Sequence, residues 1–413
     1  MTDSCSHPTL LIHGQKSASL KDKTIVLAVT GSIAAVRVVE LVRELIRNGA
    51  DVHAVTTSAA ERIIHPDALH YSTGHDVIRE LTGKVEHVEF CGLKGLANLL
   101  LIAPATANTI GKIANGIDDT PVTTFATTAI GSNIPVIVVP AMHQSMYNHP
   151  GVTKNIEKLK SWGICFIDPY IEEGIAKIAS NDVILLNVER ALGNCKFAGK
   201  RILITSGATA EPIDPIRILT NRSSGKTGIE LALEAYRRGS EVTLVHRNHL
   251  NIPGINEIFV ETAEQMTDAV LLELGKGYDA LISAAAISDY TLDAVKDKIK
   301  SGEILSLTLR PTRKLIREAR EAHPRLVIVG FKAETGVTPD ELLKRAHDTL
   351  HESNLDLIVA NDVSEGGIGT DQNEVHIIGK CKPETLHISG TKRLIASLLL
   401  DELAEVLQAE GVS

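Results

Sequence analysis

The sequence predicts an α/β protein with two doubly wound parallel sheets in tandem. The first observation is a sequence pattern that occurs twice: a short β-branched apolar run ends in Thr/Ser-Gly at Gly31 and again at Gly207. The second is that each half alternates strand-like apolar runs with helix-like patterns. The third is that runs such as 99–103 and 135–139 are almost continuously apolar, which is typical of parallel strands buried on both faces. Both halves are therefore expected to be Rossmann/flavodoxin-like.

The first half contains five expected strands and four expected helices. The strands are 24–30, 51–56, 98–103, 134–139 and 164–167, and the helices are 33–48, 57–63, 107–115 and 151–161. Residues 1–22 precede the first strand and are expected to form a loosely ordered leader. The first domain is expected to cover 23–190.

The second half, 191–413, shows the same alternation of expected strands and helices. The joint between the two domains is expected near 185–199. Its expected strands are 201–205, 241–245, 280–284, 326–330, 356–360 and 374–378. Its expected helices are 226–238, 263–274, 312–320, 339–351 and 391–408.

Composition narrows the class of function. The 413 residues carry 42 Lys+Arg against 51 Asp+Glu, a net charge of −9, and 3% aromatic residues, which argues against a non-specific nucleic-acid binder. Five widely spaced cysteines form no CxxC pair, so neither a zinc ribbon nor a disulfide framework is expected. No apolar run is long enough to span a bilayer, and no signal peptide is visible. We therefore expect a cytoplasmic protein without nucleic-acid or membrane partners.

Three turns of the first half carry hydroxyl groups directly after predicted strands. They contain Thr30-Gly31-Ser32, Thr57-Ser58 and Ala103-Pro-Ala-Thr106-Ala-Asn108. Ligands of doubly wound sheets bind at the carboxyl ends of strands, so these turns predict one shared pocket that suits an anion. The alternative is that Gly31 only makes a turn. The dinucleotide fingerprint GxGxxG does not occur here.

On these motifs, together with Ile64-His-Pro66 and Pro140-Ala-Met142 followed by Met146-Tyr147, residues 23 to about 180 resemble the flavin-dependent cysteine decarboxylase family. The resemblance implies FMN, and decarboxylation of an acyl-cysteine after oxidation of its thiol, with no net redox change. The cofactor-binding positions that it implies are Gly31, Ser32, Thr57, Ser58, Ala103, Thr106, Asn108 and Met142.

Three further positions bear on the decarboxylase chemistry. His87 matches the family's active-site histidine in His-x-Glu, although a surface histidine is the alternative reading. His143 stands where the family has an asparagine, and an imidazole can also hydrogen-bond a carboxylate. The stretch 170–178 corresponds to the family's mobile flap but lacks its cysteine. Glu172, Glu173 or Lys177 could supply the proton instead, while Cys165 is expected to be a small core residue.

The second half has its own candidate anion site. Ser223, Ser224, Gly225 and Lys226 place hydroxyls, amides and a cation at a helix start, in a spacing that differs from the P-loop. A strand then ends in 284–286, followed by Asp289 and, further on, Lys298. This acid and this lysine suit metal–nucleotide handling, and a solvated charged loop is the alternative.

Residues 199–405 resemble phosphopantothenate–cysteine ligase. The resemblance is carried by 207–217, 221–226, 284–290, Lys298-Ile, 330–335, 354–356 and 360–362. It implies that a nucleoside triphosphate, CTP or ATP with Mg²⁺, activates the carboxylate of 4′-phosphopantothenate as an acyl-nucleotidyl intermediate, which cysteine then attacks.

The ligase resemblance also implies a role for each matching residue. Asn221 would hold the intermediate, and Lys298 would stabilise charge during the attack. Asp289 and Phe331 would contact the nucleotide, and Ala284, Ala285 and Ala286 would line its site by backbone. Two lysines of the bacterial pattern are replaced by Thr349 and Ser353, with Lys344 and Arg345 one turn earlier. The resemblance does not identify the residues that bind the metal.

Together the two halves resemble the bifunctional enzymes of coenzyme A biosynthesis, in an archaeal-type form. Ligation and decarboxylation would be consecutive steps that yield 4′-phosphopantetheine. The resemblance also implies a homo-oligomer with dimer and trimer contacts, up to a dodecamer. Two alternatives stay open: an active ligase whose flavin half does not decarboxylate, and a flavoprotein oxidoreductase with net electron transfer.

Overall fold

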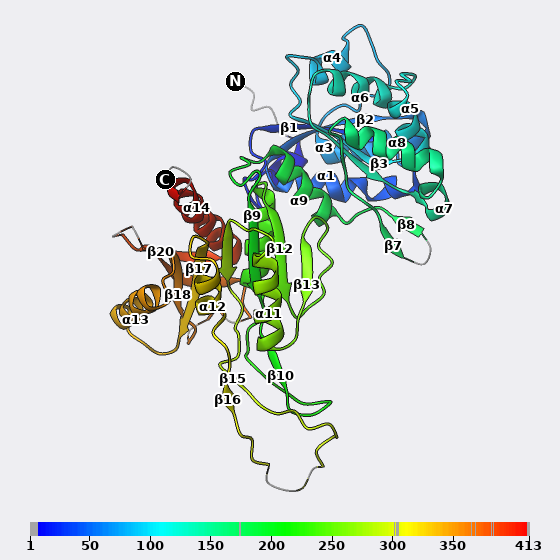
Figure 1. Cartoon of the computed structure of the whole chain (residues 1–413). Helices are drawn as coiled ribbons and strands as arrows, with labels where there is room; N and C mark the ends of the chain where they lie inside the picture. The colour runs from blue at the N-terminus through cyan, green and yellow to red at the C-terminus, as the bar shows by residue number, and fades with distance from the viewer. Residues whose placement is uncertain are drawn as a thin grey trace. The chain divides into compact units, whose positions relative to one another are not determined.

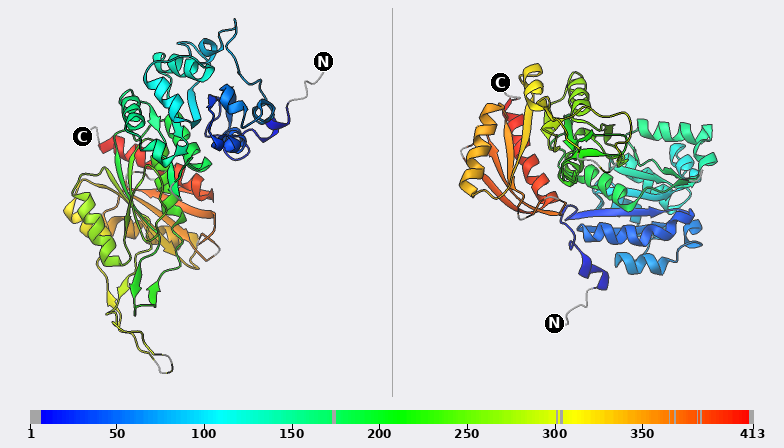
Figure 2. Two further views of the ribbon diagram at one scale, coloured as in Figure 1. Left: turned by 90° about the vertical axis from the view of Figure 1, so that its right-hand side faces the viewer. Right: turned by 90° about the horizontal axis from the view of Figure 1, so that it is seen from below.

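The computed structural model describes residues 7–410 except 173, 174, 301, 303, 304, 365, 368, 381 and 383. The chain divides into two compact units, Met1–Gly193 and Asn194–Ser413. Each unit is a sheet with helices on both faces, which confirms the predicted fold class (Figures 1 and 2). No helix within the described residues combines the length and the apolar character that crossing a membrane requires.

Unit 1 is built on a five-stranded parallel sheet in the order β2-β1-β3-β4-β6. This is the flavodoxin order, whose switch point lies between the first and third strands. The strands are β1 (Lys23–Val29), β2 (Ala50–Thr56), β3 (Leu99–Ala105), β4 (Val136–Pro140) and β6 (Cys165–Phe166).

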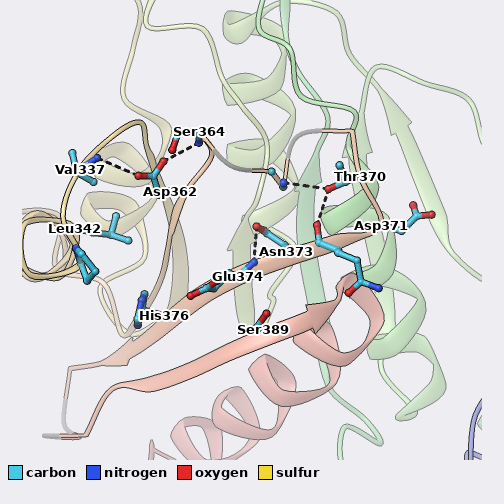
Figure 3. A pocket seen from close by; sticks show the side chains of 14 residues that line it. Val337, Leu342, Asp362, Ser364, Thr370, Asp371, Asn373, Glu374, His376 and Ser389 are labelled. Atoms are coloured by element: carbon cyan, nitrogen blue, oxygen red, sulfur yellow. Dashed lines mark hydrogen bonds between the residues drawn. The ribbon is translucent and has the colours of Figure 1, made fainter.

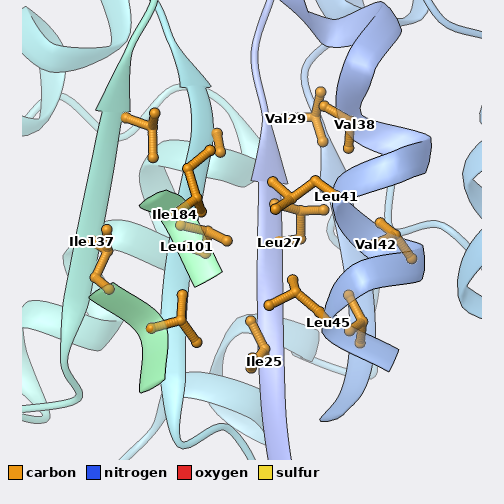
Figure 4. Packing of buried hydrophobic residues seen from close by; sticks show 14 of the residues in the cluster. Ile25, Leu27, Val29, Val38, Leu41, Val42, Leu45, Leu101, Ile137 and Ile184 are labelled. Atoms are coloured by element: carbon orange, nitrogen blue, oxygen red, sulfur yellow. The ribbon is translucent and has the colours of Figure 1, made fainter. Parts of the chain in front are cut away.

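Alternate residues of β1 enter two separate apolar cores. Ile25, Leu27 and Val29 pack against α1 (Val38–Arg47), as Figure 4 shows, whereas Val26 and Ala28 enter the core on the other face. The side-chain period of two places apolar residues on both faces of a strand, so a doubly covered strand has to be apolar throughout. The remaining helices are η1 (Pro8–Ile12), η2 (Ile33–Arg37), α2 (Ser58–Glu61), α3 (Pro66–Thr73), α4 (Glu86–Cys91), α5 (Ala107–Ala114), α6 (Pro121–Gly131), α7 (Gln144–Tyr147), α8 (Pro150–Ser161) and α9 (Asn181–Leu192).

Two sequence expectations for unit 1 are wrong. The part of the leader from residue 7 to 22 is not loose: Leu20 is fully buried, and the amides of Gly14 and Lys16 donate to carbonyls at the end of α1. Cys165 is exposed rather than a core residue. It lies on a two-residue edge strand, where Ile164 and Ile167 on either side take the buried positions.

Unit 2 contains an eight-stranded sheet in the order β13-β12-β9-β14-β17-β18-β19-β20. The first six are parallel in the Rossmann order 3-2-1-4-5-6, and β19 and β20 extend the sheet antiparallel. The strands are β9 (Arg201–Ser206), β12 (Glu241–His246), β13 (Asn256–Phe259), β14 (Ala280–Ser283), β17 (Val327–Glu334), β18 (Leu357–Asp362), β19 (Gln372–Gly379) and β20 (Leu386–Thr391).

Helices α11 (Ala263–Leu274), α12 (Leu315–Ala322) and α13 (Pro339–Glu352) share one core of unit 2 with the sheet. Helices α10 (Lys226–Arg237) and α14 (Lys392–Glu410) pack against each other and against other strands of the sheet. Two short ribbons, β10 (Ala210–Pro212) with β11 (Ile218–Thr220) and β15 (Tyr290–Thr291) with β16 (Arg310–Pro311), belong to segments that reach away from the sheet (Figure 1).

Candidate cofactor and nucleotide sites

A cavity of about 590 Å³ opens at the switch point of the unit 1 sheet. Its walls come from the segments that follow β1, β3 and β4, which is where ligands of this fold bind. Most of the wall is apolar, with a few polar groups among it. The lining residues are Gly31, Ser32, Ile33, Ala34, Val36, Arg37, Thr106, Ala107, Ala141, Met142, His143, Met146, Lys177 and Ile178.

Hydrogen bonds and close packing hold the three predicted turns together. The buried Thr30 hydroxyl donates to the Pro104 carbonyl at 2.7 Å and accepts from the Thr106 amide at 3.0 Å. A Cβ at Gly31 would lie 2.6 Å from the Cβ of Ala59, so only glycine allows the first turn to approach α2. The turns meet through side-chain and backbone contacts that the sequence motif does not display.

Some of the predicted cofactor-binding and catalytic residues line the cavity, and others lie outside it. Gly31, Ser32, Thr106, Met142 and His143 line it. Thr57 caps α2 by accepting from the Ala60 amide, Ala103 is fully buried within β3, and Ser58 and Asn108 are exposed. These four residues shape the surrounding turns rather than the wall of the cavity.

His143 is held in one tautomer by its position as the cap of α7. The Ser145 amide donates to its Nδ1, and the Ser145 hydroxyl lies 3.0 Å from the same atom. A backbone amide can only donate, so in the neutral ring that accepts this bond at Nδ1 the hydrogen lies on Nε2. His143 therefore offers a donor at Nε2.

The flap segment pairs with the strand that carries His143. In a three-stranded antiparallel sheet, β8 (Ile175–Lys177) lies between β5 (Met142–His143) and β7 (Tyr170–Glu172), with Met142 opposite Ala176. This pairing brings Lys177 to the wall of the cavity. Glu173 lies outside the described residues, as does the side chain of Glu172.

His87 occupies the second position of α4 and does not belong to the described wall of this cavity. Its Nδ1 is buried and has no hydrogen-bond partner among the described residues. A buried polar atom without a partner is uncommon in proteins and calls for a group that completes it. Tyr147 also lies outside the wall; burial, and then Asp168, which accepts from its hydroxyl, raise its pKa to about 12.

A second cavity, of about 750 Å³, opens beside β14 and β17 of unit 2. Ala285, Asp289 and Phe331, all predicted nucleotide contacts, line it. The sequence motifs did not indicate the cations, which come from α12 and the residues before it. Four basic residues belong to the wall, beside the acidic residues Asp289, Glu321 and Glu352: Arg313, Lys314, Arg317 and Arg320. The run Arg-Lys-x-x-Arg at a helix start was the signal that could have shown them.

These four cations differ in how firmly they are held. Arg320 is a structural clamp, since its guanidinium donates to Asp356 and to three carbonyls. Arg313 pairs with both Asp268 and Glu318. Lys314 pairs with Asp289 at 2.6 Å and Arg317 with Glu321 at 2.9 Å, and both of these pairs are exposed. Exposed ion pairs contribute little, so Lys314 and Arg317 can turn toward an anionic ligand.

The other predicted residues of unit 2 lie around this cavity or apart from it. The Asn221 side chain donates to the Ala286 carbonyl at 3.2 Å, and the Ala286 amide donates to Gly207 at 2.8 Å. The turn at Ala284–Ala286 is thereby tied to the turn after β9. Lys298 is exposed on the segment between β15 and β16 and does not reach the cavity wall in this chain.

The predicted phosphate cradle does not join the second cavity. Lys226 pairs with Asp371 at 2.7 Å, Ser224 is exposed, and the Ser223 hydroxyl accepts from the Gly225 amide. Lys226 lines a small cavity of about 280 Å³ together with Asp371, Lys392 and Arg393. Asp371 also lines a third, larger cavity of about 620 Å³, shown in Figure 3. Its wall is acidic, with Asp362, Asp371 and Glu374. The amide and hydroxyl of Ser364, with the amides of Gly336 and Val337, lower the pKa of Asp362 to about 2. An acidic wall disfavours a triphosphate.

The architecture defines the protein's class: a two-unit α/β protein that combines an apolar cavity of cofactor size in a flavodoxin-order unit with a basic cavity in a Rossmann-order unit. The family called Flavoprotein matches residues 13–193, and the DNA/pantothenate metabolism flavoprotein C-terminal domain matches residues 197–407. The chain belongs to the family of Coenzyme A biosynthesis bifunctional proteins CoaBC.

Curated relatives match over nearly their whole length. The CoaBC protein of Thermococcus kodakarensis is 49% identical over 406 residues, which are 97% of this chain and 100% of the relative. That of Methanocaldococcus jannaschii is 40% identical over 99% of this chain and 100% of the relative. Among solved structures, the C-terminal domain of a CoaBC protein aligns with 52% of this chain and 100% of its own, at a TM-score of 0.45 and 32% identity.

Proposed function

We propose that this chain is a bifunctional enzyme of coenzyme A biosynthesis. Unit 2 joins 4′-phosphopantothenate to cysteine at the expense of a nucleoside triphosphate, and unit 1 decarboxylates the product with FMN. The observation that carries this is the presence of two cavities of opposite character, each at the carboxyl edge of its own sheet. Membership in the CoaBC family supports the same pair of reactions.

In the ligase half, the basic cavity is proposed to hold CTP or ATP. Lys314 and Arg317 are proposed to contact the triphosphate, taking the place of the bacterial lysines that read Thr349 and Ser353 here. Asp289 and Glu352 at the wall offer carboxylate oxygens, the donors that Mg²⁺ prefers. Asn221 is proposed to hold the acyl-nucleotidyl intermediate, and Lys298 to stabilise charge during cysteine attack.

In the decarboxylase half, the apolar cavity fits a flat cofactor with a polar tail. Its volume lies within the roughly 300–1,000 Å³ of small-molecule sites, and the hydroxyl-bearing residues Ser32 and Thr106 line its wall, where a hydroxyl can donate to an anionic group. FMN, when bound, supplies the reversible oxidation of the substrate thiol. His143 is proposed to bind the substrate carboxylate through Nε2–H, and Lys177 to deliver a proton after carbon dioxide leaves.

The oligomeric state is proposed from the surroundings of the same cavity. Ile33, Val36 and Met146 line it, yet they are 75%, 56% and 50% exposed. A second copy covering them would complete the site, and it could also bring its own His87. We expect light scattering to give a homo-oligomeric mass, and a monomeric mass would contradict this. A cytoplasmic location is part of the proposal and is supported by the free thiols of Cys91 and Cys165.

The deciding experiment incubates the purified chain with 4′-phosphopantothenate, cysteine, Mg²⁺ and either CTP or ATP, followed by mass spectrometry. We expect phosphopantothenoylcysteine to form and then lose the mass of carbon dioxide. A product that stops at phosphopantothenoylcysteine would show a flavin half without decarboxylase activity. If no acyl-cysteine forms with either nucleotide, the ligase proposal is wrong.

A further inference from the structure

Two histidines and one carboxylate meet at the edge strand of the unit 1 sheet. Asp51 and His53 lie on β2, and His75 lies in the turn after α3. One Asp51 oxygen is 2.7 Å from His75 Nε2, and the other is 3.0 Å from His53 Nε2. One ligand atom from each residue lies within 4.8 Å of the other two. The cluster stands near the amino end of β2, whereas the cofactor cavity belongs to the carboxyl ends of the strands.

The surrounding backbone holds all three side chains in place. Asp51 and His53 are anchored by the parallel pairing of β2 with β1. The His75 amide donates to the Thr73 hydroxyl at 3.1 Å, and Ile78 exchanges two backbone hydrogen bonds with β2. The turn is therefore fixed beside the strand at both ends. The two imidazoles stack with centroids 4.0 Å apart, and Phe90 of α4 packs on His53 at 4.6 Å.

Two imidazoles and a carboxylate form a donor set that divalent transition metals bind. Zinc binds histidine nitrogen at about 2.0–2.1 Å and carboxylate oxygen at about 2.0–2.2 Å, which in a tetrahedron separates the ligand atoms by about 3.4 Å. The oxygen–nitrogen separations here are 2.7 Å to Asp51 Oδ1 and 3.0 Å to Asp51 Oδ2, and one ligand atom from each residue lies within 4.8 Å of the others, so modest shifts of the three side chains would bring them to this spacing. The three side chains are 18–47% exposed, which leaves a path for an ion and room for water as a further ligand.

We propose that Asp51, His53 and His75 form a binding site for a divalent transition metal of the zinc class. The ion would replace the hydrogens that now join the two rings to the carboxylate, and it would fasten the turn at His75 to the edge strand. This site is separate from both proposed catalytic cavities and does not depend on the proposed function.

The test uses the full chain, treated with a chelator and kept reduced, and titrates it with Zn²⁺ in competition with a chromophoric chelator. Wild type is expected to bind one Zn²⁺ per chain that His53→Gln/His75→Gln does not bind. His53→Gln, His75→Gln and Asp51→Asn are each expected to lower the affinity for this ion by about tenfold or more, since each removes a ligand. The matched control is His347→Gln, an exposed histidine of α13, which should bind Zn²⁺ as wild type does.

Two further readouts separate a metal site from a hydrogen-bonded cluster. Zn²⁺ should raise the melting temperature of wild type and of His347→Gln, but not that of the double variant. Mg²⁺ should not compete, because it prefers oxygen ligands. The proposal is overturned if wild type and the folded double variant bind Zn²⁺ with equal stoichiometry and affinity, or if Mg²⁺ displaces the ion at equal concentration. In that case the cluster only forms hydrogen bonds.

Discussion

His143 offers a chemically defined donor, because the Ser145 amide occupies its Nδ1 and leaves the hydrogen on Nε2. Replacement by leucine should remove the bond to the substrate carboxylate, and a hydrogen bond to a charged group is typically worth about 1.5–3 kcal/mol. We therefore predict that His143→Leu lowers kcat/KM for decarboxylation by about 10- to 100-fold. Carbon dioxide release from phosphopantothenoylcysteine measures this.

Two controls accompany the leucine variant. His143→Asn should keep most of the activity, because an amide also donates and asparagine is the residue that the decarboxylase pattern carries here. The ligation rate of the same preparation should be unchanged. Decarboxylation at the wild-type rate by the leucine variant, with flavin still bound, would show that His143 does not contact the carboxylate.

Lys314 and Arg317 line the basic cavity but were not among the nucleotide-binding residues predicted from the sequence. Replacing either with glutamine should raise KM for the nucleotide by about tenfold, because each loses a charge-assisted hydrogen bond to phosphate. Steady-state ligation at varied CTP and ATP measures the change. Lys344→Gln is the matched control, since Lys344 is exposed on α13 and lies outside the described wall of the cavity. Equal KM values for the control and both variants would contradict the assignment.

At the scale of elements, the first turn of helix α10 packs closely against the end of strand β9. Gly228 allows this close approach because it has no side chain. A Cβ at Gly228 would lie 2.5 Å from the hydroxyl oxygen and 2.6 Å from the Cβ of Ser206, whose hydroxyl donates to the Gly225 carbonyl. Gly228→Ala should therefore destabilise unit 2 by about 1–3 kcal/mol, the range for overpacking. Urea unfolding measures this.

Gly275 is the matched control for this packing prediction. It follows α11 at φ −61°, and its Cβ would meet the Leu272 carbonyl at an ordinary 3.4 Å. Gly275→Ala should leave stability unchanged or raise it, because alanine has less backbone entropy to lose than glycine. A Gly228→Ala variant as stable as wild type would mean that α10 can shift without cost.

Helix α6 is an element that helix propensities do not predict. Its sequence is rich in threonine, a residue with modest helix propensity, and no helix was predicted there. Thr120 and Thr123 form a reciprocal capping box, and Pro121 occupies the first turn. Val122, Phe125, Ala126 and Ala129 are then buried on one face. Capping and burial together outweigh the low intrinsic preference.

For the whole molecule, a buried histidine predicts the pH dependence of stability. His246 at the end of β12 is 3% exposed and lies 3.0 Å from Glu257. Burial holds the pKa of His246 below its usual range, although Glu257 opposes this. The unfolded chain therefore binds more protons than the folded chain near the ordinary histidine pKa of about 6.5.

Stability should consequently fall as pH decreases through about 6.5, and it should be retained above that pH. We predict a lower melting temperature at pH 5.5 than at pH 7.5, and a smaller difference for His246→Gln, which keeps a donor toward Glu257 without a titrating ring. Scanning calorimetry at both pH values measures this. An equal difference in the variant would place the titrating group elsewhere, for instance at His376, whose pKa is also lowered by burial.

The sequence by itself determined the fold class, the family and most strands of both parallel sheets. Strands buried on both faces must be apolar throughout, so β1, β3 and β4 stand out in the linear chain. The glycine and hydroxyl motifs after these strands are equally local, because a turn at a strand end needs particular residues wherever the rest of the chain goes. Edge strands such as β13 and β20 were missed because they are short and partly exposed.

Only the tertiary structure decided which of these motifs share a cavity. The pairing of β5 with β8 brings His143 and Lys177 to the wall of one cavity, whereas Lys226 pairs with Asp371 and does not belong to the described wall of the basic cavity. The cations of α12, and the cluster of Asp51, His53 and His75, likewise come from segments joined by packing. Which side chains face one another depends on strand order and loop position. These are properties of the whole fold that a local motif does not contain.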